Sequence, residues 1–399
     1  MQSAWRGNAA RYLISQNLFV FGSSTVTFAI LWYLALKTAS GAWMTYASLA
    51  GTLPAILISL FAGVWADRCS RKWLVIGASA IVTVLTLVLA VVFLTVDHSL
   101  WVLLAISAVR SFGNGVEMPA ANALLPEIVP KEQLTRMNGL NQIVMSLMLL
   151  MSPLLAGWIL GDAGIFWIFI VDATTALLAI LALLRLDPPK RKRAPVTDSN
   201  WQELKSGLTA VVHNHTLAVF MAFVALAYIL ITPSSQLSTL YVKRTFGSGV
   251  WALTFNELAW TVGASLGGLY IVMNKQLKAP LNTMVIGFFG SGIAFFAMGL
   301  VEPFWIYLFF MFVSGIFYPI MQAAQTIYLQ ETVSPELMGR TFSLWQILST
   351  GIYPIAMLGY GPLADVIPIG PIFVVTGLAL AVAATIFYWQ HRRSATNAD

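Results

Sequence analysis

The chain has 399 residues, of which 58% are hydrophobic and only 10% are charged, and its mean hydropathy is +0.79. This composition excludes an ordinary soluble domain, which needs far more polar residues to cover its surface. The one cysteine, Cys69, excludes an internal disulfide and any cysteine-rich metal cluster. We therefore expect an all-α integral membrane protein.

Twelve apolar runs follow one another along the chain. A helix needs roughly 20 apolar residues to cross a bilayer, and backbone groups in lipid must be satisfied internally, so these runs predict helices. The predicted spans are residues 12–36, 43–65, 73–95, 99–122, 138–160, 165–184, 216–234, 250–273, 281–301, 304–328, 340–362 and 370–389. They form two sets of six, residues 1–184 and 215–399. The seventh run is interrupted by "TPSS" at 232–235.

A polar linker, residues 185–214, joins the two predicted bundles. It opens with the basic sequence "RLDPPKRKRAP" and continues with apolar residues at helical spacing, which predicts an amphipathic helix lying on the membrane face. Those apolar residues are Trp201, Leu204, Leu208, Val211 and Val212. A lipid or regulator site there is one interpretation, and a solvated linker that follows the topology is the simpler one.

The basic residues set the orientation, because Lys and Arg near helix ends are retained on the cytoplasmic side. With the N-terminus inside, 18 of the 22 Lys and Arg residues fall on cytoplasmic segments. The exceptions are Lys37, Lys243 and Arg244, which fall outside, and Arg110, which falls within a span. Both termini are therefore predicted to be cytoplasmic. The net charge of +6 reflects this bias and gives no support for nucleic-acid binding.

The two halves contain a repeat. The sequence "EIVPKEQLTRMNGLNQI" at 127–143 matches "ETVSPELMGRTFSLWQI" at 331–347, and Gly157 matches Gly361 at the same offset. Duplicated bundles predict alternating access to a midplane site, as in secondary transporters. No phosphate-binding P-loop pattern occurs, so coupling to an ion gradient is expected rather than direct use of ATP.

A charged loop separates the second and third spans. Its sequence, "GVWADRCSRKWL" at 63–74, resembles the G-x-x-x-D-R-x-x-R-[RK] loop of the major facilitator superfamily. The matching residues are Gly63, Asp67, Arg68, Arg71 and Lys72. The resemblance implies that Asp67 acts in gating by contacting the cytoplasmic start of the eleventh predicted span, 340–362, since a carboxylate is favoured at a helix N-terminus. Topology alone would explain the basic residues, and the second half has Ile271 in place of this acid.

A second motif lies in the fifth span, where "SPLLAG" at 152–157 resembles the G-P-x-x-G-G motif of antiporters. The segment keeps Pro153 and Gly157 and has Ser152 in place of the first glycine. Proline removes a backbone hydrogen bond and small residues allow close packing, so the segment is either a bend on which one half rocks or a simple packing site.

Charges within the spans are functional hypotheses, because each costs about 2.5–3.5 kcal/mol at a helix centre. Arg110 and Glu117 lie two turns apart on the fourth span, about 10 Å along one face, with Asn114 between them. One hypothesis is that Glu117 carries a proton while Arg110 tunes its affinity, and the alternative is a permanent ion pair. Asp172 and Glu257 could each bind a proton or a cationic substrate, although Glu257 could instead be a solvated vestibule residue. Asp365 is placed at the outer end of the eleventh predicted span, 340–362, and is assigned no role.

The superfamily's architecture implies a cavity lined by spans that carry few charges and many aromatic and methionine side chains. Such surfaces suit large amphipathic molecules, although packing explains most of these residues. They are Phe19, Phe21, Trp32, Met145, Met148, Met151, Tyr228, Trp251, Trp260, Phe317, Tyr318, Met321 and Trp345.

Within the superfamily the chain resembles the macrolide-efflux type of drug:proton antiporter. The resemblance rests on 47–72 with its charged loop, on "VRSFGNGVEMPAANALLPEIVPKEQLT" at 109–135 and on "GRTFSLWQI" at 339–347. It implies a multi-pass, monomeric exporter of amphipathic drugs in the bacterial cytoplasmic (inner) membrane, in contact with lipid. A siderophore exporter, and a lipid transporter or importing symporter of the same fold, are the alternatives. No His/Asp or Ser/His arrangement predicts an enzyme, and His213 with His215 is too weak a pattern for a metal site.

Overall fold

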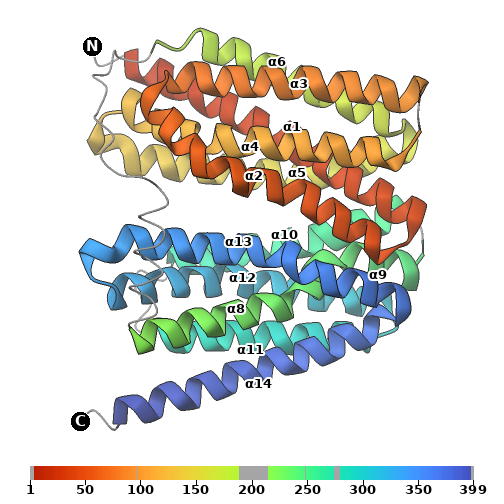
Figure 1. Ribbon diagram of the computed structural model, residues 1–399, viewed down its shortest axis with the longest axis vertical. Helices are drawn as coiled ribbons and strands as arrows, with labels where there is room; N and C mark the ends of the chain where they lie inside the picture. The colour runs from red at the N-terminus through yellow and green to blue at the C-terminus, as the bar shows by residue number, and fades with distance from the viewer. Residues whose placement is uncertain (1–3, 97, 188–213, 248, 274–278, 397–399) are drawn as a thin grey trace. The chain divides into compact units, whose positions relative to one another are not determined.

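The chain is all-helical in the computed structural model, which describes residues 4–96, 98–187, 214–247, 249–273 and 279–396 (Figure 1). Counting α8 and α9 as one span, these ranges contain twelve long helices, which confirms the predicted fold. The helices are α1 (Ala4–Thr38), α2 (Gly41–Arg68), α3 (Arg71–Thr95), α4 (Leu100–Ile128), α5 (Leu134–Asp162), α6 (Ile165–Leu184), α8 (His215–Gln236), α9 (Ser238–Thr245), α10 (Val250–Met273), α11 (Pro280–Met298), α12 (Phe304–Thr332), α13 (Pro335–Val366) and α14 (Ile369–Thr396), with a short 3-10 turn, η1 (Lys131–Gln133), before α5.

Several helices run past the apolar runs that predicted them. The first begins at Ala4 rather than near residue 12, and α13 extends beyond 340–362 at both ends. Polar residues at the membrane surface continue the helix because its internal hydrogen bonds remain favourable there. We expected the "TPSS" sequence to interrupt the seventh span, but it lies inside α8. The break follows at Leu237, whose amide still donates to the Pro233 carbonyl at 2.8 Å.

Two compact units make up the chain: residues 1–37 with 46–197 form unit 1, and residues 38–45 with 198–399 form unit 2. The connection between α1 and α2 thus belongs to unit 2, although most of both helices belongs to unit 1. Most of the predicted linker, with its amphipathic helix, lies at 188–213, outside the described residues.

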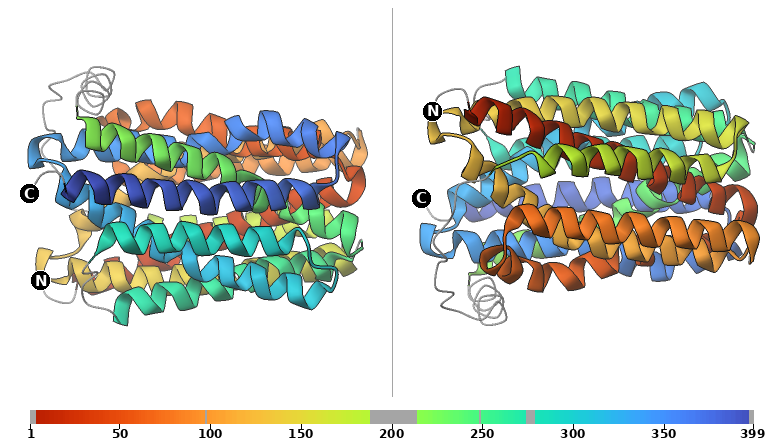
Figure 2. Two further views of the ribbon diagram at one scale, coloured as in Figure 1. Left: turned by 90° about the horizontal axis from the view of Figure 1, so that it is seen from below. Right: turned by 90° about the horizontal axis from the view of Figure 1, so that it is seen from above.

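In unit 1, α3 packs against both α4 and α6 (Figures 1 and 2). An apolar cluster closes one end of the unit, where the start of α1 meets the ends of α4 and α6. Tyr12 is buried in this cluster and donates a hydrogen bond to the Ala121 carbonyl at 3.0 Å. The cluster therefore packs together the ends of α1, α3, α4, α5 and α6, of which α4 carries Arg110 and Glu117 and α6 carries Asp172.

Unit 2 is built on the pairs α10 with α12, α12 with α11, and α11 with α14, while α8 packs on α13 and α14 (Figure 2). The α10–α12 contact is especially close. A side-chain carbon on Gly263 or Gly267 would strike the backbone carbonyl of Phe312 or Ile316, so the two helices meet through backbone. Small residues four apart are the usual means of such an approach in membranes.

Ten of the helical segments are long and apolar enough to cross a membrane. Among the long helices, α4 and α10 fall outside this set. These two carry Arg110 with Glu117 and Glu257, which the sequence analysis singled out as intramembrane charges. Each unit therefore has one long helix outside this set that carries predicted site residues.

The α10–α12 contact yields a stability prediction. We expect Gly267→Ala to lower the free energy of unfolding by about 1–3 kcal/mol, because the new methyl group must displace the Ile316 carbonyl and the Pro319 ring. Thermal unfolding of the purified protein in detergent measures the effect. Gly268→Ala is the matched control, since nothing lies within 4 Å of a side-chain carbon there. Equal melting temperatures for the two variants would contradict the close approach.

Candidate functional site

A cavity of about 280 Å³ lies among α1, α3, α4 and α6 of unit 1. It brings together four of the five predicted intramembrane site residues: Arg110, Asn114, Glu117 and Asp172. Most of the polar side chains in the remaining lining come from α1 and α3. The remaining lining residues are Gln16, Phe19, Val20, Ser23 and Ser24 of α1, Ser79, Val82 and Thr83 of α3, Met118 of α4 and Ala176 of α6. We call this the unit 1 cavity.

The strongest interaction in the unit 1 cavity is a buried ion pair. Two nitrogens of the Arg110 guanidinium on α4 donate to the two carboxylate oxygens of Asp172 on α6, at 2.5 and 3.0 Å. Both residues are about 95% buried. A two-pronged contact of this kind is the most favourable geometry for an arginine and a carboxylate, and each charge compensates the other in a medium that penalises both.

The first helix makes room for this pair at Gly22. A side-chain carbon at Gly22 would collide with the Thr175 hydroxyl and lie 2.9 Å from an Asp172 carboxylate oxygen. Glycine therefore lets α1 cover the ion pair directly. The sequence analysis overlooked Gly22, because a glycine in an apolar run carries no sign of the acid it faces on another helix.

Glu117 has a different partner from the one expected. The sequence suggested a contact with Arg110 on the same helix, whereas the Ser79 hydroxyl of α3 donates to the Glu117 carboxylate at 2.9 Å. Arg110 pairs with Asp172 instead. Glu117 is half-buried, so its carboxyl group faces the cavity while held by a neutral group. A hydroxyl can donate to a carboxylate or accept from a carboxylic acid, which suits either protonation state.

Two further donors in this region lack partners. Arg110 Nε and Gln16 Nε2 are buried, and neither has a hydrogen-bond acceptor among the described residues. Buried polar groups are normally satisfied by protein, water or ligand. The unit 1 cavity therefore has unused hydrogen-bonding capacity beside the ion pair.

A second cavity, of about 260 Å³, lies within unit 2 and contains Glu257. It is lined by α8, α9, α10, α11, α12 and α13, and we call it the unit 2 cavity. Glu257 receives a long hydrogen bond of 3.4 Å from Asn256 and has no ion-pair partner in the part of the chain that the structure describes. Three of the predicted cavity residues, Trp260, Tyr318 and Met321, also line it.

The other predicted cavity residues are distributed differently. Phe19 lines the unit 1 cavity. Trp32 is completely buried in the core, and Trp251 and Met151 are exposed. Aromatic content alone therefore could not separate binding residues from packing residues.

The charged loop is described only in part. Gly63, Asp67 and Arg68 lie at the end of α2, and their side chains fall outside the described residues. Arg71 donates to the Ala123 carbonyl at 2.7 Å and pairs with Glu127 at 3.0 Å, both at the end of α4. Lys72 donates to the carbonyls of Leu184 and Leu186 at the end of α6. These cations thus cap helix ends, where a positive charge is favourable.

The antiporter-like motif lies inside α5. Ser152 and Pro153 are buried, as is Gly157, and the Ser152 hydroxyl lies 2.7 Å from the Met148 carbonyl and 3.3 Å from the Phe21 carbonyl of α1. Pro153 leaves α5 continuous as a helix. The segment packs against α1, and its role as a bend stays a prediction.

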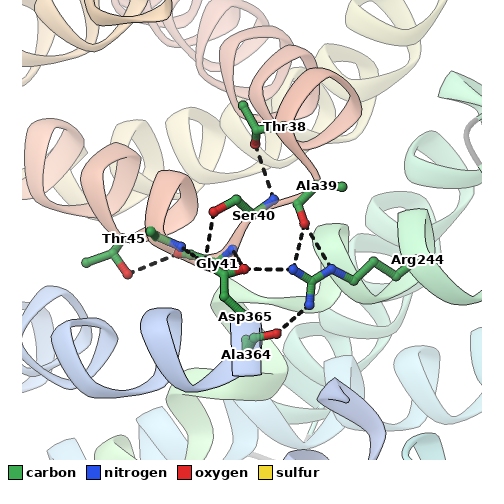
Figure 3. A network of polar contacts seen from close by, with 9 residues as sticks. Thr38, Ala39, Ser40, Gly41, Thr45, Arg244, Ala364 and Asp365 are labelled. Carbon is green, nitrogen blue, oxygen red and sulfur yellow. Dashed lines mark hydrogen bonds and ion pairs between the residues drawn. The ribbon is translucent and has the colours of Figure 1, made fainter. Parts of the chain in front are cut away.

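Asp365, which the sequence analysis left without a role, is the centre of a polar network at the end of α13 (Figure 3). Its carboxylate accepts hydrogen bonds from the backbone amides of Gly41 and Ala42 at 2.6 and 2.9 Å, and from the Ser40 hydroxyl at 2.9 Å. Arg244 of α9 pairs with it at 2.8 Å. The acid therefore caps the first turn of α2 and receives a guanidinium from α9.

Arg244 extends the network to the chain before α2. It donates to the Ala39 and Ala364 carbonyls as well as to Asp365 (Figure 3). Gly41 and Gly361 lie so close that a side-chain carbon on either would strike the other segment's backbone or Thr45. We call this set, from Ala39 to Thr45 with Arg244, Gly361 and Asp365, the Asp365 cluster. Its one sequence signal was Gly361, which the repeat had already matched to Gly157.

Comparisons with known proteins agree with this architecture. The chain is 27% identical to macrolide efflux protein A of Streptococcus pyogenes, with 93% of each chain covered. It is 25% identical to the enterobactin exporter EntS of Salmonella typhi, over 76% of this chain and 73% of that one. The crystal structure of the nucleoside transporter NupG matches its fold with a TM-score of 0.71 at 14% identity, covering 96% of this chain and 98% of that one.

The match to a family model extends over residues 12–357, from α1 through most of α13. It includes both cavities and the charged loop, and the relatives it groups are multi-pass transporters rather than enzymes. On this match the chain belongs to the Major Facilitator Superfamily.

Proposed function

We propose that this protein is a proton-coupled antiporter that exports amphipathic compounds such as macrolides across the bacterial cytoplasmic membrane by alternating access. The observation that carries the proposal is Glu117, an acid in a membrane cavity whose hydrogen-bond partner is the neutral hydroxyl of Ser79. An intramembrane acid without a dedicated cation is typical of proton relays in transporters.

The charges around the unit 1 cavity support Glu117 over Asp172 as the proton carrier. The charged lining residues are Arg110, Asp172 and Glu117. Arg110 and Asp172 cancel each other, so the cavity is neutral when Glu117 is protonated and carries one negative charge when it is ionised. Asp172 is already compensated, and protonating it would leave the Arg110 guanidinium unpaired and buried, which is strongly unfavourable.

The relatives support a hydrophobic cargo. The name macrolide efflux protein A describes a relative that matches over most of both chains. The apolar side of the unit 1 cavity and the aromatic lining of the unit 2 cavity suit amphipathic molecules. The enterobactin exporter among the relatives favours a siderophore as the second candidate cargo. A lipid transporter or symporter of the same fold is the remaining alternative.

The Asp365 cluster supports alternating access. It holds the connection between α1 and α2 against α13 and α9 through an ion pair, helix-capping bonds and a glycine contact. Any change that frees this connection must break all of these together. We place this cluster at the outer end of the protein, and Asp67 in the gating loop at the inner end.

Glu117→Gln tests proton coupling. We expect the variant to fold normally, because glutamine can still accept a hydrogen bond from Ser79. We also expect it to lose macrolide-driven proton movement almost completely, because an amide side chain neither binds nor releases a proton near neutral pH. A pH-sensitive dye in reconstituted vesicles with an imposed pH gradient measures the flux. Glu302→Gln, at an exposed acid before α12, is the matched control.

A panel of cargoes in the same vesicles separates the candidate functions. Macrolides, cationic dyes and siderophores are added one at a time. Proton movement with siderophores alone would favour the second candidate, and movement with none of the three would overturn the export proposal. Wild-type flux in Glu117→Gln would reassign the proton to another acid.

The ion pair gives a prediction of non-additive stability. Asp172→Asn leaves the Arg110 charge buried and uncompensated, so we expect it to lower the free energy of unfolding by about 3–5 kcal/mol. The double variant Arg110→Gln with Asp172→Asn removes both charges and should recover much of that loss. Thermal unfolding of the wild type, both single variants and the double variant completes the cycle. Additive losses would mean that the two side chains are not coupled.

The Asp365 cluster gives a prediction of accessibility. In a Cys69→Ser background, a thiol introduced by Ala42→Cys should react with a membrane-impermeant maleimide at least about tenfold faster when Asp365→Ala is added. The reason is that each hydrogen bond to a charged group contributes about 1.5–3 kcal/mol. Glu302→Gln in place of Asp365→Ala is the control. An unchanged labelling rate would show that the carboxylate does not hold the connection closed.

A further inference from the structure

The two cavities differ in charge. The unit 1 cavity contains Arg110 together with two acids, whereas the described lining of the unit 2 cavity contains Glu257 and no Lys, Arg or His. Asn256 gives Glu257 one long hydrogen bond and is itself bound by the Tyr307 hydroxyl at 2.8 Å. The carboxyl group of Glu257 is thus the one formal charge that the described lining supplies.

The interruption between α8 and α9 borders the same cavity. Ser234, Ser235 and Gln236 at the end of α8, with Ser238 at the start of α9, all line it. Interrupted helices are found at the ligand sites of transporters, and here the end of α8 and the start of α9 adjoin, so their opposite partial charges offset each other. Ser234 is 1% exposed, and its hydroxyl has no hydrogen-bond partner among the described residues.

Aromatic rings complete the lining. Trp260 and Tyr318 lie with their ring centroids 5.4 Å apart at a tilt of 56°, and Tyr353 lines the cavity beside them. The close approach of α10 and α12 holds the first two rings together, because a side-chain carbon on Gly315 would strike the Trp260 carbonyl. Tryptophan and tyrosine faces attract a cation within about 6 Å of the ring centre.

We propose that the unit 2 cavity binds an organic ammonium group, with Glu257 as counter-ion and the faces of Trp260 and Tyr318 as the walls. A volume of about 260 Å³ accommodates an ammonium group with small alkyl substituents and leaves the bulk of an amphipathic molecule outside. The inference rests on the proposed function in one respect, namely that the ammonium group belongs to the exported compound.

This assignment separates the two coupled ions. The proton is bound at Glu117 in unit 1 and the cationic group of the cargo at Glu257 in unit 2. Proton and cargo then need not exchange at a single carboxylate. The transporter would then recognise a cationic group small enough to enter the unit 2 cavity, and the remainder of the cargo molecule could vary.

A pair of probes tests the site by binding alone. One is a dansyl fluorophore joined by a short alkyl chain to a trimethylammonium group, and the other carries a neutral tert-butyl group of the same shape. Fluorescence anisotropy with the purified full-length protein in lipid nanodiscs measures both affinities. The wild type should bind the ammonium probe at least about tenfold more tightly, since the carboxylate and the rings recognise only the charge.

Substitutions locate the site. Glu257→Gln should abolish the difference between the two probes, and Trp260→Leu should reduce it severalfold while leaving the tert-butyl probe less affected. Glu302→Gln, away from both cavities, is the control, and melting temperatures establish that each variant is folded. Trp260→Leu keeps the test valid if Glu257→Gln fails to fold.

Two results would overturn the proposal: equal binding of both probes by the wild type, or loss of the preference in Glu117→Gln but not in Glu257→Gln, which would move the cation to unit 1. The measurement needs no proton gradient and no transport. Failure of macrolide-driven proton movement with a retained ammonium preference would therefore refute the exporter mechanism and leave the binding site in place.

Discussion

The ion pair between Arg110 and Asp172 is the constraint on which unit 1 depends. Two opposite charges inside a membrane bundle are tolerated only while they stay together, so α4 and α6 must keep their register to within an ångström or so at that level. Gly22 exists at the matching level of α1 because any larger residue would push into Asp172. The apolar cluster around Tyr12 holds the same helices at one end of the bundle. What this arrangement leaves over is Glu117, which is close enough to share the cavity but has no cation of its own.

Unit 2 solves the same problem with one charge and no partner. Glu257 is accommodated by Asn256 and by an aromatic cavity rather than by an arginine. The two units therefore share an architecture while differing in chemistry. In unit 1 the ion pair compensates its own charges and leaves Glu117 without a cation, whereas Glu257 in unit 2 lies in an aromatic cavity whose described lining has no Lys, Arg or His. The proposed proton carrier and the proposed cation site both rest on this difference. This difference follows from Arg110 on α4 and Asp172 on α6, since the described lining around Glu257 contains no corresponding pair.

The sequence was sufficient to predict the twelve helices, because a segment's own length and hydropathy determine whether it is stable as a helix across a bilayer. It also identified Arg110, Glu117, Asp172 and Glu257, since any charge in an apolar run stands out. It could not predict the interaction partners of these charged side chains. Spacing along α4 suggested Arg110 with Glu117, but the partners come from α6 and α3, whose rotation about their own axes is set by packing. The break at Leu237 was displaced for a related reason: a proline in a membrane helix does not by itself end the helix when the following residues can bond around it.

Asp365 was missed because an acid at the end of a span looks like an ordinary solvated residue until the first turn of α2 is placed against it. Its chemistry is the same as that implied for Asp67 by the family resemblance, a carboxylate opposite a helix N-terminus. Helix α2 begins at Gly41, capped by Asp365 from the end of α13, and ends at Arg68, next to the acid expected to meet the start of α13. The gating contact proposed for Asp67 would repeat this chemistry at the other end of α2. Under the alternating access proposed above, the two contacts would favour opposite states, and the free energy gained when one forms would offset the loss of the other.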